Sequence, residues 1–118
     1  MSYYDDKRMT IRRWFAGFTE ATGEVPTHVV FGYSYWSSKM VAEIWPEVVS
    51  NALVPMEELP DSLLDREFDD GFGGNNSPDL CAWSMSWVLF SDNYDGAESL
   101  CWVPRHPVAH EPIRPGGG

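Results

Sequence analysis

Three side chains near the C-terminus have the chemistry of zinc ligands: Cys101, His106 and His110. A fourth, Cys81, lies in a segment expected to form a neighbouring strand. Structural zinc is held by four such ligands at about 2.0–2.3 Å. No Cys-x2-Cys pair anchors this set, and the prolines around the histidines favour an extended chain. The main prediction is therefore that the chain binds no metal and no cofactor, with a small zinc-dependent enzyme as one alternative.

Other catalytic and ion-binding motifs do not match. A calcium loop counted from Asp65 needs Gly at its sixth position and Glu at its twelfth, where the chain has Asp70 and Asn76. None of the three histidines lies in a recognisable motif with a nucleophilic Ser or Cys. The sequence thus predicts that the protein is not an enzyme. It also predicts that the two cysteines are small, unpaired core residues on adjacent strands.

Negative charge is concentrated in the middle of the chain. The 118 residues carry a net charge of −10, and the segment 43–98 holds thirteen acidic residues against one basic residue, Arg66. Such a field repels the phosphates of nucleic acids and membranes and attracts basic surfaces. Direct binding to nucleic acid or to a membrane is disfavoured, and a protein partner with a basic, nucleic-acid-binding groove is favoured. A role of the acidity in solubility alone remains the alternative.

The seven carboxylates between residues 57 and 70 are predicted to form an acidic partner-binding face. A helix from Pro60 to Gly71 would place three aspartates four residues apart in one stripe, where their repulsion opposes the helix and so suggests a function. The predicted face consists of Glu57, Glu58, Asp61, Asp65, Glu67, Asp69 and Asp70. Trp36 and Trp45 flank the least regular segment and are predicted to be interface anchors.

The elements that position these residues follow from local patterns. Residues 10–24 predict a helix with Thr10 as N-cap and Gly23 as terminator. The apolar residues that share one face of this helix are Ile11, Trp14, Phe15 and Phe18. Residues 27–36 predict a strand lying against the helix. Segments 80–84, 86–92 and 97–103 predict further strands, with a tight turn at Asn93–Gly96 between the last two.

These elements predict a single α+β domain over residues 1–105, in which an antiparallel sheet of three or four strands packs against the N-terminal helix. Residues 106–118, rich in Pro and Gly, are expected to form an extended tail. The charged N-terminus lacks the apolar segment of a signal peptide, and no run of about 18 apolar residues is present. A cytoplasmic location is therefore expected.

Residues 67–107 resemble a pattern found in small acidic proteins of phages and mobile elements. The shared features are an acidic pair before Gly-aromatic-Gly-Gly, an Ala-Trp strand, an aromatic strand ending in Tyr-Asp-Gly, and Val-Pro-Arg before a Pro. The resemblance covers about a third of the chain. It implies a small α+β domain and brings no assigned activity for individual residues.

Proteins of this kind are similar in character to the anti-CRISPR and anti-restriction inhibitors of bacterial defence, several of which place carboxylates where DNA phosphates would bind. The resemblance therefore implies an acidic DNA mimic that binds a basic surface of a defence complex in the host cytoplasm. An alternative is a structural or assembly subunit that packs on a virion protein or on copies of itself, as in a homodimer. In that alternative the acidity serves solubility alone.

Overall fold

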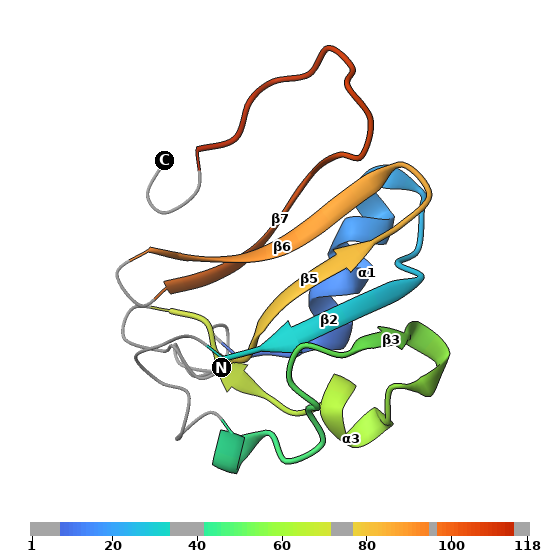
Figure 1. Ribbon diagram of the computed structural model, residues 1–118. Coiled ribbons are helices and arrows are strands. Elements are labelled where there is room, and N and C mark those ends of the chain that lie inside the picture. Colours follow the sequence, from blue (N-terminus) through green and yellow to red (C-terminus); the bar gives the residue numbers. More distant parts are fainter. Residues whose placement is uncertain (1–7, 34–41, 72–76, 95–96, 115–118) are drawn as a thin grey trace.

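A helix on one side of an antiparallel sheet forms the body of the protein (Figure 1). The computed structural model describes residues 8–33, 42–71, 77–94 and 97–114. Helix α1 (Ile11–Thr22) lies behind a sheet whose strand order is β3-β2-β5-β6-β7. The bounds of these strands are β2 His28–Gly32, β3 Leu53–Pro55, β5 Asp79–Trp83, β6 Trp87–Tyr94 and β7 Ala97–Pro104. The predicted α+β domain, with an N-terminal helix packed on an antiparallel sheet, is confirmed.

The sheet has five strands, where the sequence predicted three or four. The additional strand, β3, has only three residues, and its Val54 pairs with Val29 of β2. A second, two-stranded sheet joins β1 (Arg8–Met9) to β4 (Phe68–Asp69). Strands this short contain too few alternating positions to be recognised from sequence, because their partners rather than their own pattern define them.

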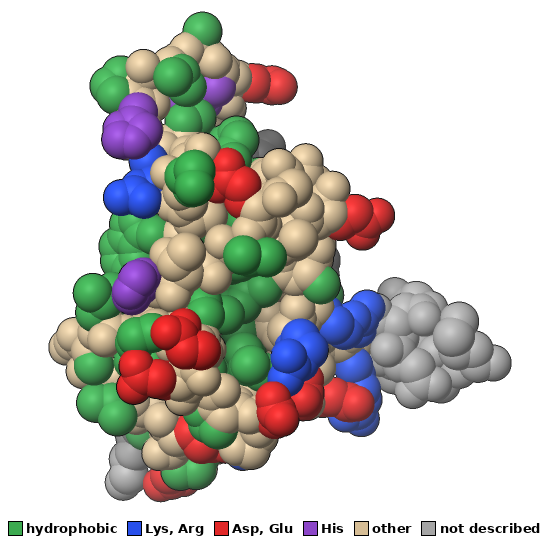
Figure 2. Space-filling model, turned by 90° about the vertical axis from the view of Figure 1, so that its right-hand side faces the viewer, with side chains coloured by type: hydrophobic (Ala, Val, Ile, Leu, Met, Phe, Trp, Pro, Cys, Tyr) green, Lys and Arg blue, Asp and Glu red, His purple; other side chains and the backbone are tan. Residues whose placement is uncertain are grey.

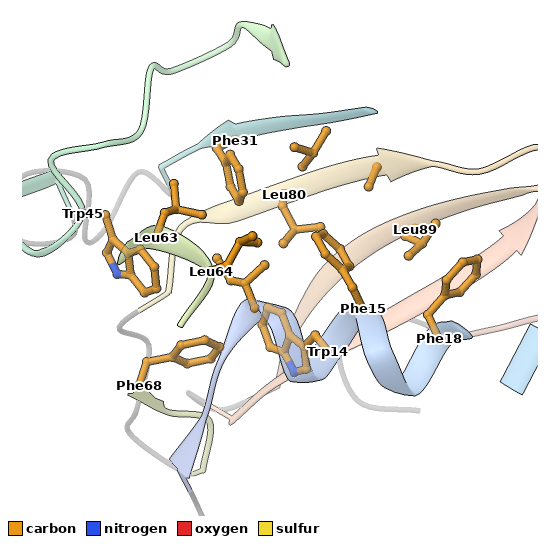
Figure 3. Packing of buried hydrophobic residues seen from close by; sticks show 13 residues of the cluster. Trp14, Phe15, Phe18, Phe31, Trp45, Leu63, Leu64, Phe68, Leu80 and Leu89 are labelled. Atoms are coloured by element: carbon orange, nitrogen blue, oxygen red, sulfur yellow. The ribbon is translucent and has the colours of Figure 1, made fainter. Parts of the chain in front are cut away.

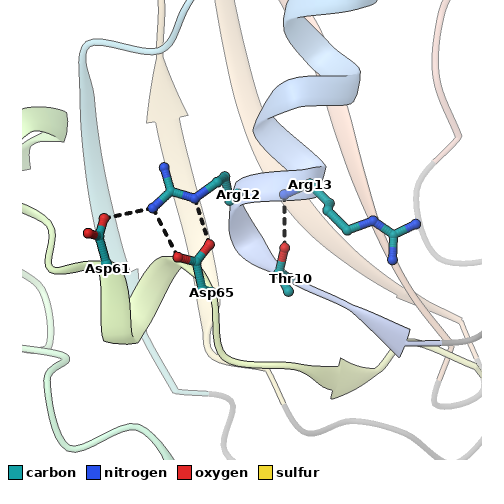
Figure 4. A network of polar contacts seen from close by, with 5 residues as sticks. All are labelled: Thr10, Arg12, Arg13, Asp61 and Asp65. Carbon is teal, nitrogen blue, oxygen red and sulfur yellow. Dashed lines mark hydrogen bonds and ion pairs between the residues drawn. The ribbon is translucent and has the colours of Figure 1, made fainter. Parts of the chain in front are cut away.

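Helix α1 begins and ends at the predicted caps. The Thr10 hydroxyl oxygen accepts a hydrogen bond from the backbone N–H of Arg13 at 3.0 Å (Figure 4). Gly23 has a φ of 79°, and its N–H donates to the Thr19 carbonyl oxygen at 2.8 Å. Both caps satisfy backbone groups that a helix terminus leaves without intrahelical partners. The chain therefore leaves the helix at a defined point and enters β2.

We expect Thr10→Ala to lower the free energy of unfolding by about 1 kcal/mol, because the Arg13 N–H loses its acceptor. Urea unfolding followed by circular dichroism measures the change. Glu20→Ala is the matched control, since Glu20 is exposed on the same helix and takes no part in capping. Equal stability of the Thr10→Ala variant and the wild type would show that this cap contributes nothing.

The core lies between α1, the inner side of the sheet and the segment that follows β3 (Figure 3). The predicted helix stripe is buried throughout: Ile11, Trp14, Phe15 and Phe18 are at most 6% exposed. The Phe18 ring meets Trp102 of β7 edge-on, with centroids 5.3 Å apart, and the Trp14 ring meets Phe68 of β4 at 5.0 Å. Edge-to-face pairs at these distances add to the energy of apolar burial. Helix α1 is thus fixed against both sheets.

The helix predicted from Pro60 to Gly71 is much shorter than expected. After the 3-10 turn η2 (Met56–Glu58), helix α3 spans only Asp61–Leu64. Asp69 instead lies in β4, where the chain is extended and places Phe68 in the core. The burial of Phe68 beside Trp14 outweighs the tendency of this segment to continue as a helix. The prediction that three aspartates line up on one face of a helix is therefore wrong.

The C-terminal half forms the predicted meander. Strands β5, β6 and β7 pair in sequence order, and the turn residues 95–96 lie outside the described residues. The described part of the predicted tail, residues 106–114, is exposed and has no helix or strand. It rises away from the sheet beyond β7 (Figure 1). Within the described ranges, no helix is long and apolar enough to cross a membrane.

Candidate interaction surface

The predicted acidic face is partly neutralised by arginines from the N-terminal segment (Figure 4). Arg12 on α1 donates from Nε to an Asp65 carboxylate oxygen at 2.6 Å and from Nη2 to Asp61 at 2.7 Å. Arg8 on β1 forms an ion pair with Glu67 at 3.2 Å. The hydrogen bond from Arg12 lowers the pKa of Asp65. Three of the seven predicted carboxylates are therefore paired with cations.

The pairing of basic with acidic side chains is also visible on the molecular surface. Figure 2 shows Lys and Arg side chains directly beside Asp and Glu side chains in the lower half of the view. Three of the predicted carboxylates, Glu57, Glu58 and Asp69, are exposed. Asp70 is half-buried, and this burial raises its pKa. Six of the seven predicted carboxylates are therefore exposed, including the three that pair with Arg8 or Arg12, and Asp70 is partly buried.

Trp45 is a core residue, and its predicted role as an interface anchor is wrong. Its side chain is 0% exposed and meets the Phe68 ring edge-on at 5.9 Å. The Arg66 guanidinium lies 5.2 Å from the Trp45 ring centroid. Proline at 46 ends the preceding helical turn and leaves the indole directed inward, where a large aromatic ring gains most from burial. The second predicted anchor, Trp36, lies outside the described residues.

Arg66, the lone basic residue of the acidic segment, has a defined structural partner. Its two Nη atoms donate to the two carboxylate oxygens of Glu47 at 2.5 and 2.7 Å. The side chains are only 27% and 18% exposed, so the pair is partly shielded from water. These hydrogen bonds lower the pKa of Glu47 to about 2. The pair ties the segment after the Trp45 turn to the end of α3.

The outer side of the sheet carries ten aligned side chains, of which nine are apolar and one, His28, is polar. Strand register aligns them in two rows that cross all five strands. The first row consists of Leu53, Val30, Cys81, Phe90 and Cys101, and the second of Pro55, His28, Trp83, Val88 and Val103. We call these ten residues the open sheet face. All are half-buried or exposed, whereas the residues that alternate with them and point inward include the buried core residues Val29, Phe31, Leu80, Ala82 and Leu89.

Among the described residues, no helix covers the open sheet face, which is turned toward the viewer in Figure 1. Its profile forms the left edge of Figure 2, where hydrophobic side chains line much of the surface. The partly buried apolar residues that pack against the core include neither Phe90 nor Trp83. An antiparallel sheet with one face on the core commonly presents polar residues on the other face. An apolar outer face therefore requires a reason.

The two ends of the open sheet face carry opposite charges. At one end, the Arg105 guanidinium donates to the Ser84 carbonyl oxygen at 2.8 Å, beside His28. Arg105 and His28 line an open hollow of about 460 Å³ together with Thr27, Leu53 and Trp83. At the other end, Asp79 begins β5, and Asp92 pairs in register with Ser99. The face thus carries Arg105 at one end, apolar side chains in the middle, and Asp79 and Asp92 at the other end. The Glu24 carboxylate also approaches the Arg105 end, where it accepts hydrogen bonds from the Ser84 hydroxyl and the Ser86 N–H.

The predicted zinc ligands do not form a site. Cys101 lies in the sheet, whereas His106 and His110 are exposed in the tail. In the described part of the chain, no group of three or more His, Cys, Asp or Glu side chains is placed to hold a metal ion. Cys81 and Cys101 are free, as predicted, but both are half-buried on the open sheet face rather than in the core, and β6 separates their strands. Burial raises the pKa of both thiols, which disfavours their reactive thiolate form.

The residue pattern of β5 is the sequence signal for the open sheet face. In β5, both alternating sets of residues are apolar: Leu80 and Ala82 point inward, while Cys81 and Trp83 point outward. Strands that are apolar on both sides are typical of sheets covered on both faces. That pattern predicts a second covering layer, which the described residues do not supply.

No protein-family model matches this chain, and neither a curated protein nor a solved structure is significantly similar to it. The resemblance of residues 67–107 to small phage proteins therefore stays a prediction. Functional inference rests on the charges and surfaces described above.

Proposed function

We propose that the protein is a non-catalytic binding protein that packs the open sheet face against another protein chain, as an assembly subunit does. The observation that supports this most directly is the pair of apolar rows crossing five strands. Contiguous exposed apolar patches are uncommon on monomeric proteins and mark interaction sites. Phe90 and Trp83 lie in these rows, and buried aromatic residues carry much of the binding energy at protein interfaces.

The acidic inhibitor is a second candidate, favoured by a specific feature beside the same face. Glu57 and Glu58 are exposed in η2, which directly follows the edge strand β3. With the net charge of −10, they favour a basic partner and accelerate its association. The partner in this candidate is a basic, nucleic-acid-binding surface of a bacterial defence complex. The pairing of three carboxylates with Arg8 and Arg12 reduces the charge available for it.

Affinity capture of protein partners at two salt concentrations distinguishes between the two candidate functions. We expect the double variant Trp83→Thr/Phe90→Thr to lose partners that remain bound to the wild type at about 1 M salt, where exposed charges are screened. Threonine keeps a high strand propensity at both positions. Val49→Thr is the matched control, because Val49 is 68% exposed and lies off the open sheet face. Circular dichroism confirms that each variant is folded.

The acidic inhibitor predicts a different pattern. Glu57→Lys/Glu58→Lys would abolish binding of partners that wild-type protein releases between about 0.15 and 1 M salt, while Trp83→Thr/Phe90→Thr would retain them. Unchanged binding in the threonine double variant at both salt concentrations would refute the proposal that the open sheet face is the binding surface.

A further inference from the structure

The charge distribution of the open sheet face is complementary to itself. Its basic end is fixed by two hydrogen bonds, because the Arg105 backbone N–H also donates to the Ser86 carbonyl oxygen at 2.9 Å. Its acidic end includes Asp79, at the opposite end of β5 from Ser84. A surface that is basic at one end and acidic at the other fits an identical surface turned end for end.

We propose that a second copy of this chain docks on the open sheet face with its strands running in the opposite direction, so that Arg105 of each copy pairs with Asp79 of the other. This inference rests on the proposed function, since it names the occupant of the same surface. It also specifies a single arrangement of the two copies.

A two-fold axis between the sheets and perpendicular to the strands produces this arrangement. Rotation about it places each strand over the same strand of the second copy and exchanges the two ends. The guanidinium of Arg105, held at the Ser84 end of β5, then lies over the Asp79 end of β5 in the second copy. Packed sheets are about 10 Å apart, a separation that long side chains from both faces can span.

The apolar rows meet in the middle of the same arrangement. The axis runs along the row that contains Cys81, Phe90 and Cys101, so this row packs against its own copy. The row containing Trp83 packs toward the acidic end of the second copy. Burial already raises the pKa of Asp79 in the single chain. A guanidinium opposite this carboxylate favours its charged form and so supports association.

The net charge of −10 opposes association of two copies at low ionic strength. At about 150 mM salt the screening length is about 8 Å, so only charges close to the interface contribute strongly. Each symmetric dimer contains the Arg105–Asp79 pair twice, which doubles the effect of a single substitution. A charge exchange at these two positions therefore gives a sensitive test.

Sedimentation equilibrium at about 150 mM salt measures the dimer dissociation constant of the wild type, Arg105→Glu, Asp79→Arg and the double variant. We expect each single substitution to weaken the dimer about tenfold or more, because it creates two like-charge contacts. The double variant restores the pair with its charges exchanged and returns the constant to within about threefold of the wild type. Arg114→Glu and Glu20→Arg are the matched controls, since both make the same charge changes at exposed positions off the face.

Thiol cross-linking tests the direction of the strands independently of charge. In the proposed arrangement Cys101 lies over Cys101 of the second copy, so a bismaleimide with a spacer of about 10 Å links Cys81→Ala chains. If the strands ran in the same direction, β7 would lie over β3 and the two Cys101 residues would be about 19 Å apart, four strand spacings. Cys101→Ala chains would cross-link through Cys81 in either direction and serve as the positive control.

A concentration-dependent dimer that is weakened by each single substitution, restored by the double variant and cross-linked through Cys101 supports the inference. Three results overturn the inference. The first is a monomer at all concentrations up to about 1 mM, and the second is a dimer whose dissociation constant does not change with the substitutions at Arg105 and Asp79. The third is cross-linking through Cys81 alone. If the chain is monomeric and Trp83→Thr/Phe90→Thr still abolishes capture of a different protein, the proposed function stands and only the second copy is excluded. If neither sedimentation nor partner capture responds to substitutions in the open sheet face, both the inference and the proposed function are refuted.

Discussion

Replacing Trp45 with alanine is expected to lower the free energy of unfolding by about 3–5 kcal/mol, the range for deletion of a large buried aromatic side chain. The indole is 0% exposed and contacts both Phe68 and the Arg66 guanidinium. Its removal leaves a cavity beside Phe68 and exposes the Arg66–Glu47 pair to water. Guanidinium chloride unfolding, followed by far-UV circular dichroism, measures the loss.

Met85→Ala is the control for Trp45→Ala, because Met85 is 80% exposed in the turn between β5 and β6. We expect its stability to remain within about 0.5 kcal/mol of the wild type. A stable Trp45→Ala variant that had lost a binding partner would instead restore the anchor role predicted from the sequence. The experiment thus distinguishes a core tryptophan from an interface tryptophan.

Glu98→Gln is expected to make the protein more stable at alkaline pH by roughly 1–3 kcal/mol and to change little at pH 5. Glu98 is 8% exposed on the inner side of β7. Burial, together with repulsion from Asp79 and Asp70, raises its pKa to about 8, although a hydrogen bond with Asn93 acts in the opposite direction. Glu98, Asp70 and Arg13 of α1 line one open hollow of about 340 Å³. A neutral amide of similar shape avoids the cost of ionising this group.

The direction of the pH effect follows from the raised pKa. A carboxyl whose folded-state pKa lies above its ordinary value of 4.5 stabilises the fold fully below pH 4.5, and this contribution is lost as pH rises through about 8. Urea unfolding at pH 5, 7 and 9 should show decreasing stability in the wild type and a flatter profile in Glu98→Gln. Glu57→Gln, a change at an exposed carboxylate, should keep the wild-type profile. Parallel profiles for wild type and Glu98→Gln would contradict this assignment.

Elements with a strong local pattern were predicted correctly. The helix caps Thr10 and Gly23 lie where the sequence places them, because capping depends on residues within one turn. The strands β5, β6 and β7 also follow from local alternation and turn residues. By contrast, β3 and the β1–β4 pair depend on partners distant in sequence. Their two or three residues carry no pattern of their own.

The charged surface was harder to predict, because its pairing depends on the tertiary fold. Arg12 is 49 residues from Asp61 and 53 from Asp65, so a count of charge along the chain treats these acids as uncompensated. The same limit applies to Trp45, whose burial follows from the position of Phe68 in β4 rather than from its own neighbours in sequence. Local charge density therefore overestimated the acidity of the surface.

The strand order also determines when the protein can fold during its synthesis. Strands β5, β6 and β7 follow one another along the chain, whereas β2 must close a loop of more than forty residues to reach β5. Helix α1 precedes every strand of the five-stranded sheet along the chain, yet Phe18 of its apolar stripe packs against Trp102 of the last strand. A nascent chain that lacks β7 therefore leaves Phe18 without this partner. We expect α1 to complete its packing only after β7 has been synthesised.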